Sequence, residues 1–412
     1  MNVLFLSMVK TSTLNGGGIY ADLLSVFAEN GHNVYVVTPV QRREGQATTL
    51  THDGNAHFLT VRTGNLQKVN LIEKGISTIL LEGQFVKAIK KHLSDVKFDL
   101  VLYSTPPITF AKVVRYIKKR DAARTYLLLK DIFPQNAVDM GMLSKSGVKG
   151  LIYRYFRRKE KLLYALSDTI GCMSPANCEY ILRENPEISA DKVEVCPNSI
   201  IIVDKSVEDS RKAEIRAKYG IPTDKKVFVY GGNLGRPQGI PFLIECLRSK
   251  KDNAEAYFLV VGDGTEYGLL EEFITAEQPA NVKVMRRLPK QDYDELVAAC
   301  DVGLIFLDHR FTIPNFPSRL LSYLQAKLPV LACTDPNTDI GRIAESAGFG
   351  WWCSSNDVSA FCDKVIECLQ ADLQACGDKA FEYLTDNYST KEAYDIIVAD
   401  NAQTIRGEIC RQ

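Results

Sequence analysis

KVFVYGGNLGRPQGIPFLIECLRSK, residues 226–250, contains the parts of one β-α unit in a single stretch. A run of β-branched and aromatic residues ends in Gly231 and Gly232, a short polar loop follows, and an apolar helical pattern begins after Gly239. A strand, a glycine loop and a helix in this order form the repeating element of a parallel sheet covered by helices.

The rest of the 412-residue chain repeats this element in both halves. The first half has predicted strands at 3–8, 33–39, 56–62, 98–106, 125–131 and 169–174. The second half has predicted strands at 226–232, 256–264, 281–288, 301–307 and 328–335. The pattern predicts an α/β protein with two doubly wound, Rossmann-like domains, since the chain is comfortably long for two cores.

The two predicted domains span residues 1–200 and 201–389. The polar stretch 201–210 is the expected linker, because domain boundaries fall in polar segments. The C-terminal segment, about 390–412, is expected to form an amphipathic helix that packs back on the first domain.

Composition argues against several classes of protein. Lys plus Arg and Asp plus Glu each number 50, so global charge gives no reason to expect a nucleic acid partner. No run of 18 apolar residues is present and the N-terminal apolar stretch is too short for a signal peptide, so we expect a cytoplasmic protein.

Cysteine and histidine patterns indicate no metal site or redox centre. The eleven cysteines include no CxxC pair, and Cys300 and Cys333 stand in apolar runs, where cysteine behaves as a small buried hydrophobe. The five histidines show no ligand spacing. Asp292 and Asp294 form a D-x-D that could hold a metal on a diphosphate, but acidic residues also favour a helix start, and we prefer this second interpretation.

Ligands of open parallel sheets gather at the carboxyl ends of the strands, and unusual residues follow several predicted strands here. Gly16, Gly17 and Gly18 follow the first one and form either a loop that receives a phosphate or acceptor or a permissive turn. After the fifth, Asp131 could orient a sugar hydroxyl or take its proton, or could be a helix cap.

Two loops of the second half suit an oxyanion such as a diphosphate. In residues 231–240, glycine amides, the start of a helix and Arg236 would favour an anion, although glycine also serves ordinary turns. In residues 316–334, Ser318 can cap a helix, and Arg319 in its first turn conflicts with the helix dipole unless an anion sits there or the side chain extends into solvent.

A basic segment, residues 144–166, follows Asp131. Its cations are Lys145, Lys149, Arg154, Arg157, Arg158, Lys159 and Lys161, interleaved with aromatic residues. This composition fits a surface helix on anionic lipid. It fits equally well a solvated helix with a core stripe of Leu151, Tyr155, Leu162 and Leu166.

Together these motifs resemble the family-4 retaining glycosyltransferases of the GT-B fold. The resemblance covers nearly the whole chain: GGGIYADLLSVFAENGHNVYVVTP in the first half, and YGGNLGRPQGI, FLVVGDGTEYGLL, NVKVMRRLPKQDYDELVAACDVGLIFL and FPSRLLSYLQAKLPVLAC in order in the second. LKDIFPQNAVDMG and the basic segment are most similar to the branch that builds capsule, O-antigen and exopolysaccharide units on a membrane lipid.

The resemblance implies two domains facing across a cleft, an N-terminal one for the acceptor and a C-terminal one for the nucleotide sugar. It implies retaining transfer of a hexosyl or N-acetylhexosaminyl group from a UDP-linked donor to a polyprenyl-diphosphate-linked or other glycan. No metal or other cofactor is expected, and the protein would work in the cytoplasm or peripherally on the cytoplasmic face of the inner membrane, through 144–166.

The resemblance also assigns roles to residues. Asp131, Arg319 and Arg236 would be catalytic, and Arg287 and Leu288 would line the base. The residues expected at the donor and its phosphates are Gly16, Gly17, Gly18, Gly232, Asn233, Gln238, Pro317, Ser318 and Ser322.

The chain also departs from the family pattern. Asn233 and Gln238 stand where many members have Arg and Lys, and the usual E-x7-E falls on Pro314 and Ser322, so both carboxylates are missing. The alternatives are therefore a catalytically silent nucleotide-sugar-binding subunit and, ranked last, a nucleotide-sugar epimerase.

Overall fold

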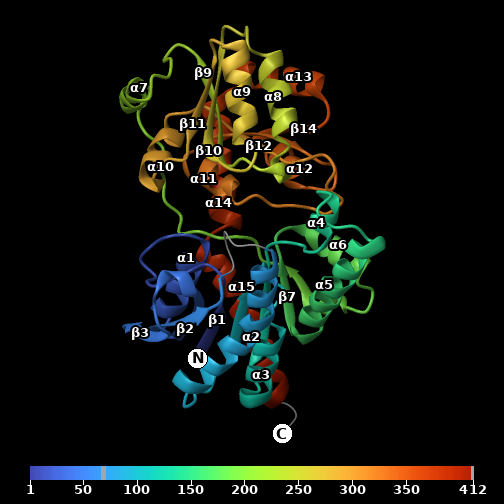
Figure 1. The fold of residues 1–412 in the computed structure, drawn as a ribbon. Helices are drawn as coiled ribbons and strands as arrows, with labels where there is room; N and C mark the ends of the chain where they lie inside the picture. Colours follow the sequence, from blue (N-terminus) through green and yellow to red (C-terminus); the bar gives the residue numbers. More distant parts are fainter. Residues whose placement is uncertain (66–70, 410–412) are drawn as a thin grey trace. The chain divides into compact units, whose positions relative to one another are not determined.

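The computed structural model describes residues 1–65 and 71–409, with side chains described over 1–65 and 77–399. The chain divides into an N-terminal unit, Met1–Ile201 together with the C-terminal helix from Thr390, and a C-terminal unit, Ile202–Ser389 (Figure 1). Residues 410–412 of the predicted C-terminal helix lie outside the described residues.

Eight strands form the sheet of the N-terminal unit, in the order β3-β4-β2-β1-β5-β6-β7-β8. Their bounds are β1 Asn2–Leu6, β2 Asn33–Gln41, β3 Thr49–Asp53, β4 Ala56–Thr63, β5 Leu100–Ser104, β6 Arg124–Leu129, β7 Thr169–Cys172 and β8 Val193–Val195. The edge strand β3 pairs antiparallel with β4, and the other pairs are parallel. The central strands are apolar runs buried on both faces, as parallel sheets require.

Helices cover both faces of this sheet. Their bounds are α1 Ile19–Glu29, α2 Leu71–His92, α3 Ala111–Asp121, α4 Gln135–Asp139, α5 Gly147–Leu166, α6 Pro175–Glu184 and α15 Thr390–Ile409, with short 3₁₀ turns at Arg42–Glu44 and Ala190–Lys192. α1 packs against α15, while α3 packs against both α2 and α5. Ala393 and Ile397 of α15 belong to the core formed by β1, β2, β5 and β6, so the C-terminal helix completes the N-terminal unit.

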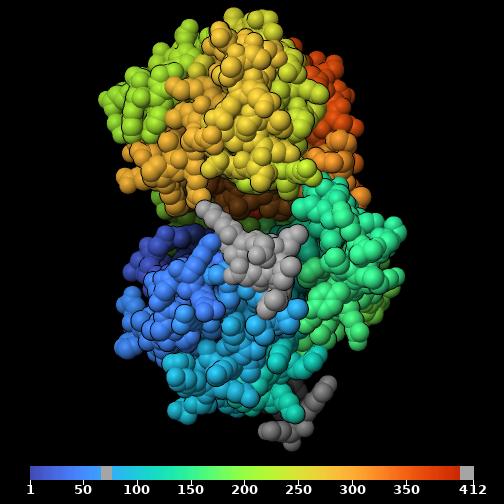
Figure 2. Space-filling model, in the orientation of Figure 1, coloured from blue at the N-terminus to red at the C-terminus, as the bar shows by residue number. Residues whose placement is uncertain are grey.

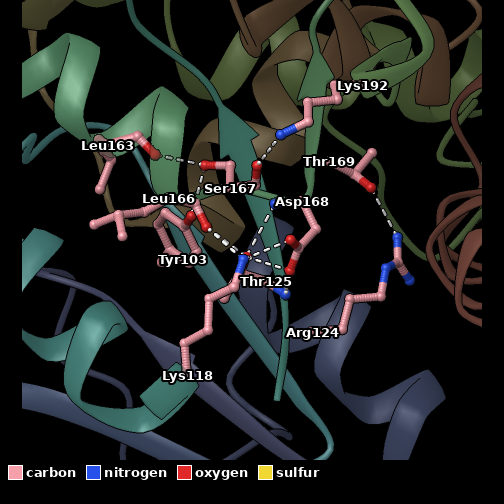
Figure 3. A network of polar contacts seen from close by, with 10 residues as sticks. All are labelled: Tyr103, Lys118, Arg124, Thr125, Leu163, Leu166, Ser167, Asp168, Thr169 and Lys192. Atoms are coloured by element: carbon pink, nitrogen blue, oxygen red, sulfur yellow. Dashed lines mark hydrogen bonds and ion pairs between the residues drawn. The ribbon is translucent and has the colours of Figure 1, made fainter. Parts of the chain in front are cut away.

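A polar network at the amino ends of β6 and β7 fastens the helices to the sheet (Figure 3). Asp168 accepts hydrogen bonds from Lys118 Nζ, at 2.5 Å, and from the backbone N–H and hydroxyl of Thr125. Burial opposes the charge of Asp168, but these donors hold its carboxyl pKa below the ordinary value. Tyr103 and Ser167 share a buried hydrogen bond of 2.6 Å beside it. The network lies at the sheet edge opposite the loop that follows β6.

The C-terminal unit has a six-stranded parallel sheet in the order β11-β10-β9-β12-β13-β14. Its strands are β9 Lys226–Asn233, β10 Ala256–Asp263, β11 Val282–Arg286, β12 Val302–Phe306, β13 Val330–Thr334 and β14 Gly350–Ser354. Its helices are α7 Asp209–Lys218, α8 Ile240–Ser249, α9 Tyr267–Glu277, α10 Lys290–Ala298, α11 Arg319–Gln325, α12 Ile340–Ser346, α13 Val358–Gln370 and α14 Leu373–Asn387, with a 3₁₀ turn at Arg236–Gln238. α8 contacts α9 and α13, whereas α10 contacts α7 and α11.

Three strands, β3, β8 and β14, were not predicted. Every residue of β3 is exposed and its sequence, TLTHD, is polar, so no apolar run marks it. β8 has only three residues. β14 consists of Gly350, two tryptophans, Cys353 and Ser354, and its pairing with β13 defines it rather than any alternation of its own.

We predict that Ile397→Ala destabilises the N-terminal unit, although residue 397 is distant in sequence from that unit's sheet. Ile397 is fully buried, so truncation should lower the free energy of unfolding by about 2–5 kcal/mol. Urea unfolding followed by circular dichroism measures the change. Ile366→Ala is the control, because Ile366 is 44% exposed. Equal losses in the two variants would contradict the docking of α15.

Candidate functional site

Two glycines, Gly231 and Gly232, lie near the end of β9 at the carboxyl edge of the C-terminal sheet. A Cβ added to Gly231 would lie 1.7 Å from the hydroxyl of Tyr293, so only glycine fits below this ring. The backbone N–H of Gly231 donates to the hydroxyl of Tyr323, at 3.1 Å, and that hydroxyl lies 3.2 Å from two backbone carbonyls. The glycine thereby fixes α10 and α11 over the strand.

Arg319 is the first residue of α11 and lies over Gly232. Gly232 has φ 127°, and a Cβ there would lie 3.5 Å from Arg319 Nη2. The guanidinium carbon lies 4.4 Å from the ring centroid of Tyr230, within the range of a cation–π contact. Nη1 of Arg319 is buried and has no hydrogen-bond partner among the described residues. A buried guanidinium N–H without an acceptor is costly, and an anionic ligand would satisfy it.

The loop after β9 is shaped by its own polar side chains. Asn233 Nδ2 donates to Gln238 Oε1 at 2.8 Å, and the N–H of Gly235 donates to the same oxygen at 3.2 Å. Asn233 and Gln238 therefore hold the loop in shape, a role that the sequence did not indicate. The side chain of Arg236 is 64% exposed, and its Nε lies 3.8 Å from Glu266 Oε1.

Pro317, Ser318 and Arg319 precede or begin α11. Arg319 lies in the first turn of this helix, as predicted, but Ser318 does not cap it. Ser318 has φ −63° and ψ −15°, a helical conformation, and its side chain makes no capping hydrogen bond. A capping side chain needs an extended backbone to reach the N–H groups of the first turn, so that prediction was wrong. Ser318 is exposed, Pro317 is half-buried beside it, and Ser322 is half-buried on α11.

Arg287 and Leu288 follow β11 directly, at the same carboxyl edge. Arg287 is exposed and Leu288 is half-buried. The preceding Arg286 is engaged elsewhere: its guanidinium lies 3.5 Å from the ring centroid of Tyr267 and pairs with Glu271 at 2.9 Å. Arg287 and Leu288 thus lie just beyond the carboxyl end of β11, and their contact with a base stays a prediction.

The glycine loop of the N-terminal unit precedes α1. Gly16, Gly17 and Gly18 are all exposed, and Gly17 and Gly18 have φ of 68° and 110°. A Cβ at Gly18 would meet no atom within 4 Å in the described structure. Glycine is required at these two positions by the backbone conformation, and the loop leaves open space beside it.

Asp131 follows β6, and Asn136 binds its carboxylate. Asn136 Nδ2 donates to both carboxylate oxygens of Asp131, at 2.8 and 2.9 Å. Burial raises the pKa of Asp131 to about 6, against the lowering effect of Asn136 and of the Ile132 N–H. Asn136 Oδ1 is buried and without a partner in the described part of the chain. The pair combines a basic carboxylate with a vacant hydrogen-bond acceptor, which suits recognition of a hydroxyl.

The amino-terminal half of α5 exposes an apolar face. Val148, Leu151, Ile152 and Tyr155 are 79%, 61%, 45% and 49% exposed, and their spacing of three and four residues places them on one face. Leu151 and Tyr155 are therefore not core residues, which excludes that interpretation of the stripe. Figure 2 shows this segment, in turquoise to green, on the surface of the N-terminal unit.

Other predictions about chemistry in the sequence can be compared with the structure. Asp292 pairs with Lys218 at 3.2 Å and Asp294 with Lys205 at 2.9 Å, so the D-x-D contributes to the packing of α10. Cys300 and Cys333 are buried with free thiols, as predicted.

No group of three or more metal-ligating side chains occurs in the described ranges. Among the helices that the structure describes, none is both long and apolar enough to cross a membrane.

Sequence reasoning missed four residues of these sites: Tyr230, Tyr293, Asn136 and Glu266. The tyrosines contact Arg319 or Gly231 only through packing between elements, so no local signal marks them. Asn136 was inside the quoted stretch after Asp131, and its spacing of five residues, across a turn into α4, could have suggested contact.

Comparison with known proteins agrees with this geometry. Residues 211–382 match the family model described as "Glycosyl transferases group 1". The chain is 27% identical over 326 residues, 78% of each chain, to a Pseudomonas aeruginosa protein named "Probable glycosyltransferase WbjE". It is 24% identical over 254 residues, 61% of each chain, to WcaI of Escherichia coli K12, which is named for colanic acid biosynthesis.

Solved structures share the fold over the whole chain. Sucrose-phosphate synthase of Thermosynechococcus elongatus superposes with a TM-score of 0.74 at 14% identity, covering 100% of both chains. Anabaena HepE, solved with UDP-glucose, gives a TM-score of 0.70 at 15% identity, covering 98% of this chain and 100% of HepE. The two α/β units with parallel sheets are those of the GT-B fold.

We predict that the Asp131 carboxyl titrates near pH 6 and that Asn136→Leu raises this midpoint, because the donor that favours the ionised form is lost. Since the folded-state pKa lies above the unfolded value, this group stabilises the fold at low pH, and the contribution is lost as pH rises through about 6. Carboxyl ¹³C NMR measures the midpoint. Gln135→Leu, at the neighbouring position of α4, is the control and should leave it unchanged. A wild-type midpoint near 4 would refute the assigned environment.

Proposed function

We propose that the chain transfers a sugar from a nucleotide-diphosphate sugar to a glycan acceptor in surface polysaccharide biosynthesis, because residues 211–382 match the family model of the group 1 glycosyl transferases. The names of its relatives support the pathway class. We further propose a UDP-linked hexosyl or N-acetylhexosaminyl donor, a polyprenyl-diphosphate-linked acceptor and retention of configuration. Structural neighbours solved with UDP or UDP-glucose support the choice of nucleotide.

The observation that carries the proposal is that Nη1 of Arg319 is buried without a hydrogen-bond partner within the described ranges. When a nucleotide-sugar bond breaks, negative charge grows on the leaving diphosphate, and a fixed cation aimed at that position stabilises the transition state. Arg319 is held by Gly232 and Tyr230 before any ligand binds, so little reorganisation is needed. Arg236, exposed at the neighbouring loop, adds a second and more mobile cation.

Roles in binding the diphosphate, the base and a sugar hydroxyl are proposed for the loops that follow β9, β11 and β6. We assign the amides of the Gly232 loop to the diphosphate, and Arg287 with Leu288 to the base. Asp131, with its raised pKa, would accept a hydrogen bond or a proton from a sugar hydroxyl, positioned by Asn136. Two arginines can neutralise the leaving group, which is the reason for proposing transfer without a metal.

We predict that Arg319→Ala lowers the rate of transfer about 10²- to 10³-fold, the usual effect of removing one donor to a developing anion. Purified protein with a panel of nucleotide sugars and a polyprenyl-diphosphate sugar should release nucleoside diphosphate, with and without EDTA. Arg248→Ala, which removes a surface arginine paired with Glu277, is the control. Equal rates for wild type and Arg319→Ala would reject the assigned site. Nucleotide binding by calorimetry without turnover would support the silent subunit instead.

We also propose that the apolar face of α5, Val148, Leu151, Ile152 and Tyr155, rests on an anionic membrane surface. Lys149, Arg154 and Arg158 are exposed on the same helix. Arg157, Lys159 and Lys161, by contrast, pair with Glu160, Glu82 and Glu187. Exposed apolar side chains rimmed by cations match the interface of an anionic bilayer, where the proposed lipid-linked acceptor would reside.

We predict that the double variant Leu151→Glu with Ile152→Glu loses most of its co-sedimentation with anionic vesicles at low salt, because two carboxylates replace the inserted side chains. Ile366→Glu changes an equally exposed apolar residue of the C-terminal unit and should bind like wild type. Turnover with a soluble acceptor should not change. If wild type ignores anionic vesicles at low salt, the membrane contact is wrong.

A further inference from the structure

Glu266 lies between the end of β10 and the start of α9, and its backbone is hydrogen-bonded to the loop after β9. The N–H of Leu234 donates to Asp263 O and the N–H of Glu266 donates to Leu234 O, both at 2.9 Å. A Cβ at Gly264 would lie 2.3 Å from Leu234 O, so glycine is required for this approach. Backbone contacts thus join the two loops and set the position of Glu266 beside the loop after β9.

The carboxylate of Glu266 has unused hydrogen-bonding capacity in the described part of the chain. Its Oε2 is buried and finds no hydrogen-bond donor among the residues described. Its Oε1 lies 3.8 Å from Arg236 Nε, beyond hydrogen-bond distance. Burial raises the pKa of Glu266, while the charges of Arg236 and Arg310 oppose that rise. A carboxylate oxygen in this state needs an O–H or N–H donor.

The two carboxylates that the family resemblance led us to expect, at 314 and 322, are Pro and Ser here. We propose that Glu266 supplies a carboxylate to the donor site: it accepts a hydrogen bond from a hydroxyl of the donor, on the ribose or on the transferred sugar. This inference rests on the proposed function, because the donor must be a nucleotide sugar.

The position of Arg236 also offsets the repulsion that the Glu266 carboxylate would exert on a diphosphate. A carboxylate close to a diphosphate would repel it, but the guanidinium of Arg236 lies on the carboxylate's Oε1 side and offsets that charge. With 64% of its side chain exposed, Arg236 can turn towards the diphosphate and leave both Glu266 oxygens to hydroxyl groups.

The test compares ligands that differ by one hydroxyl. Calorimetry measures affinities for UDP, 2′-deoxy-UDP, 3′-deoxy-UDP, UDP-glucose, UDP-2-deoxyglucose and inorganic pyrophosphate. We expect wild type to lose roughly 10- to 100-fold in affinity when the recognised hydroxyl is absent, as for a hydrogen bond to a charged group. Glu266→Ala should lose the same factor for the hydroxylated ligand, bind the deoxy ligand like wild type, and keep its affinity for pyrophosphate.

Two further variants, measured with the same ligands, test the role of the carboxylate charge and serve as a control. Glu266→Gln, which keeps the shape of the side chain, should show reduced discrimination if the charge matters, and Glu272→Ala, exposed on α9, should behave like wild type. Equal loss of pyrophosphate and nucleotide affinity in Glu266→Ala would overturn the inference, since Glu266 would then act only through Arg236. Failure of wild type to bind any nucleotide would refute the proposed function itself.

Discussion

The contact of the Arg319 guanidinium with Gly232 and the ring of Tyr230 is the constraint on which the candidate site depends. It requires two glycines near the end of β9, because Gly231 makes room for Tyr293 and Gly232 has φ 127°, a conformation that favours glycine. It also requires α11 to start where it does, which Tyr323 ensures through its hydrogen bonds to β9 and β12. A cation is thereby held, partly desolvated and incompletely bonded, at the carboxyl edge of a parallel sheet.

Close backbone packing at a glycine and a hydrogen bond between side chains also fix the neighbouring loops. Gly264 lets the loop after β10 lie against Leu234, and Asn233 with Gln238 closes the loop after β9. In the N-terminal unit, burial raises the pKa of Asp131, although the hydrogen bonds from Asn136 favour the ionised carboxylate. Each unit thus presents polar groups at the ends of its strands, while the amino ends carry closed networks such as the one around Asp168.

The fold was largely predictable from local patterns. Buried parallel strands are short apolar runs, and glycine-bounded helices follow them, so the eleven predicted strands all have counterparts in the structure. β3 and β8 could not be predicted, because an exposed polar edge strand and a three-residue strand carry no periodic signal. Ser318 was misread because its residue type suits a cap, whereas its backbone conformation, set by the preceding loop, does not.

The sequence by itself determined the succession of β-α elements, the positions of the glycines and the identity of Arg319, Arg236 and Asp131 as unusual residues at strand ends. These are local properties, because they depend only on residue type and on spacing along the chain. Only the tertiary structure decided that, among the described residues, Arg319 Nη1, Glu266 Oε2 and Asn136 Oδ1 are buried without a hydrogen-bond partner. It also decided that Leu151 and Tyr155 face outward. Burial and hydrogen-bond satisfaction arise from residues brought together from distant parts of the chain, and so no single segment of sequence contains them.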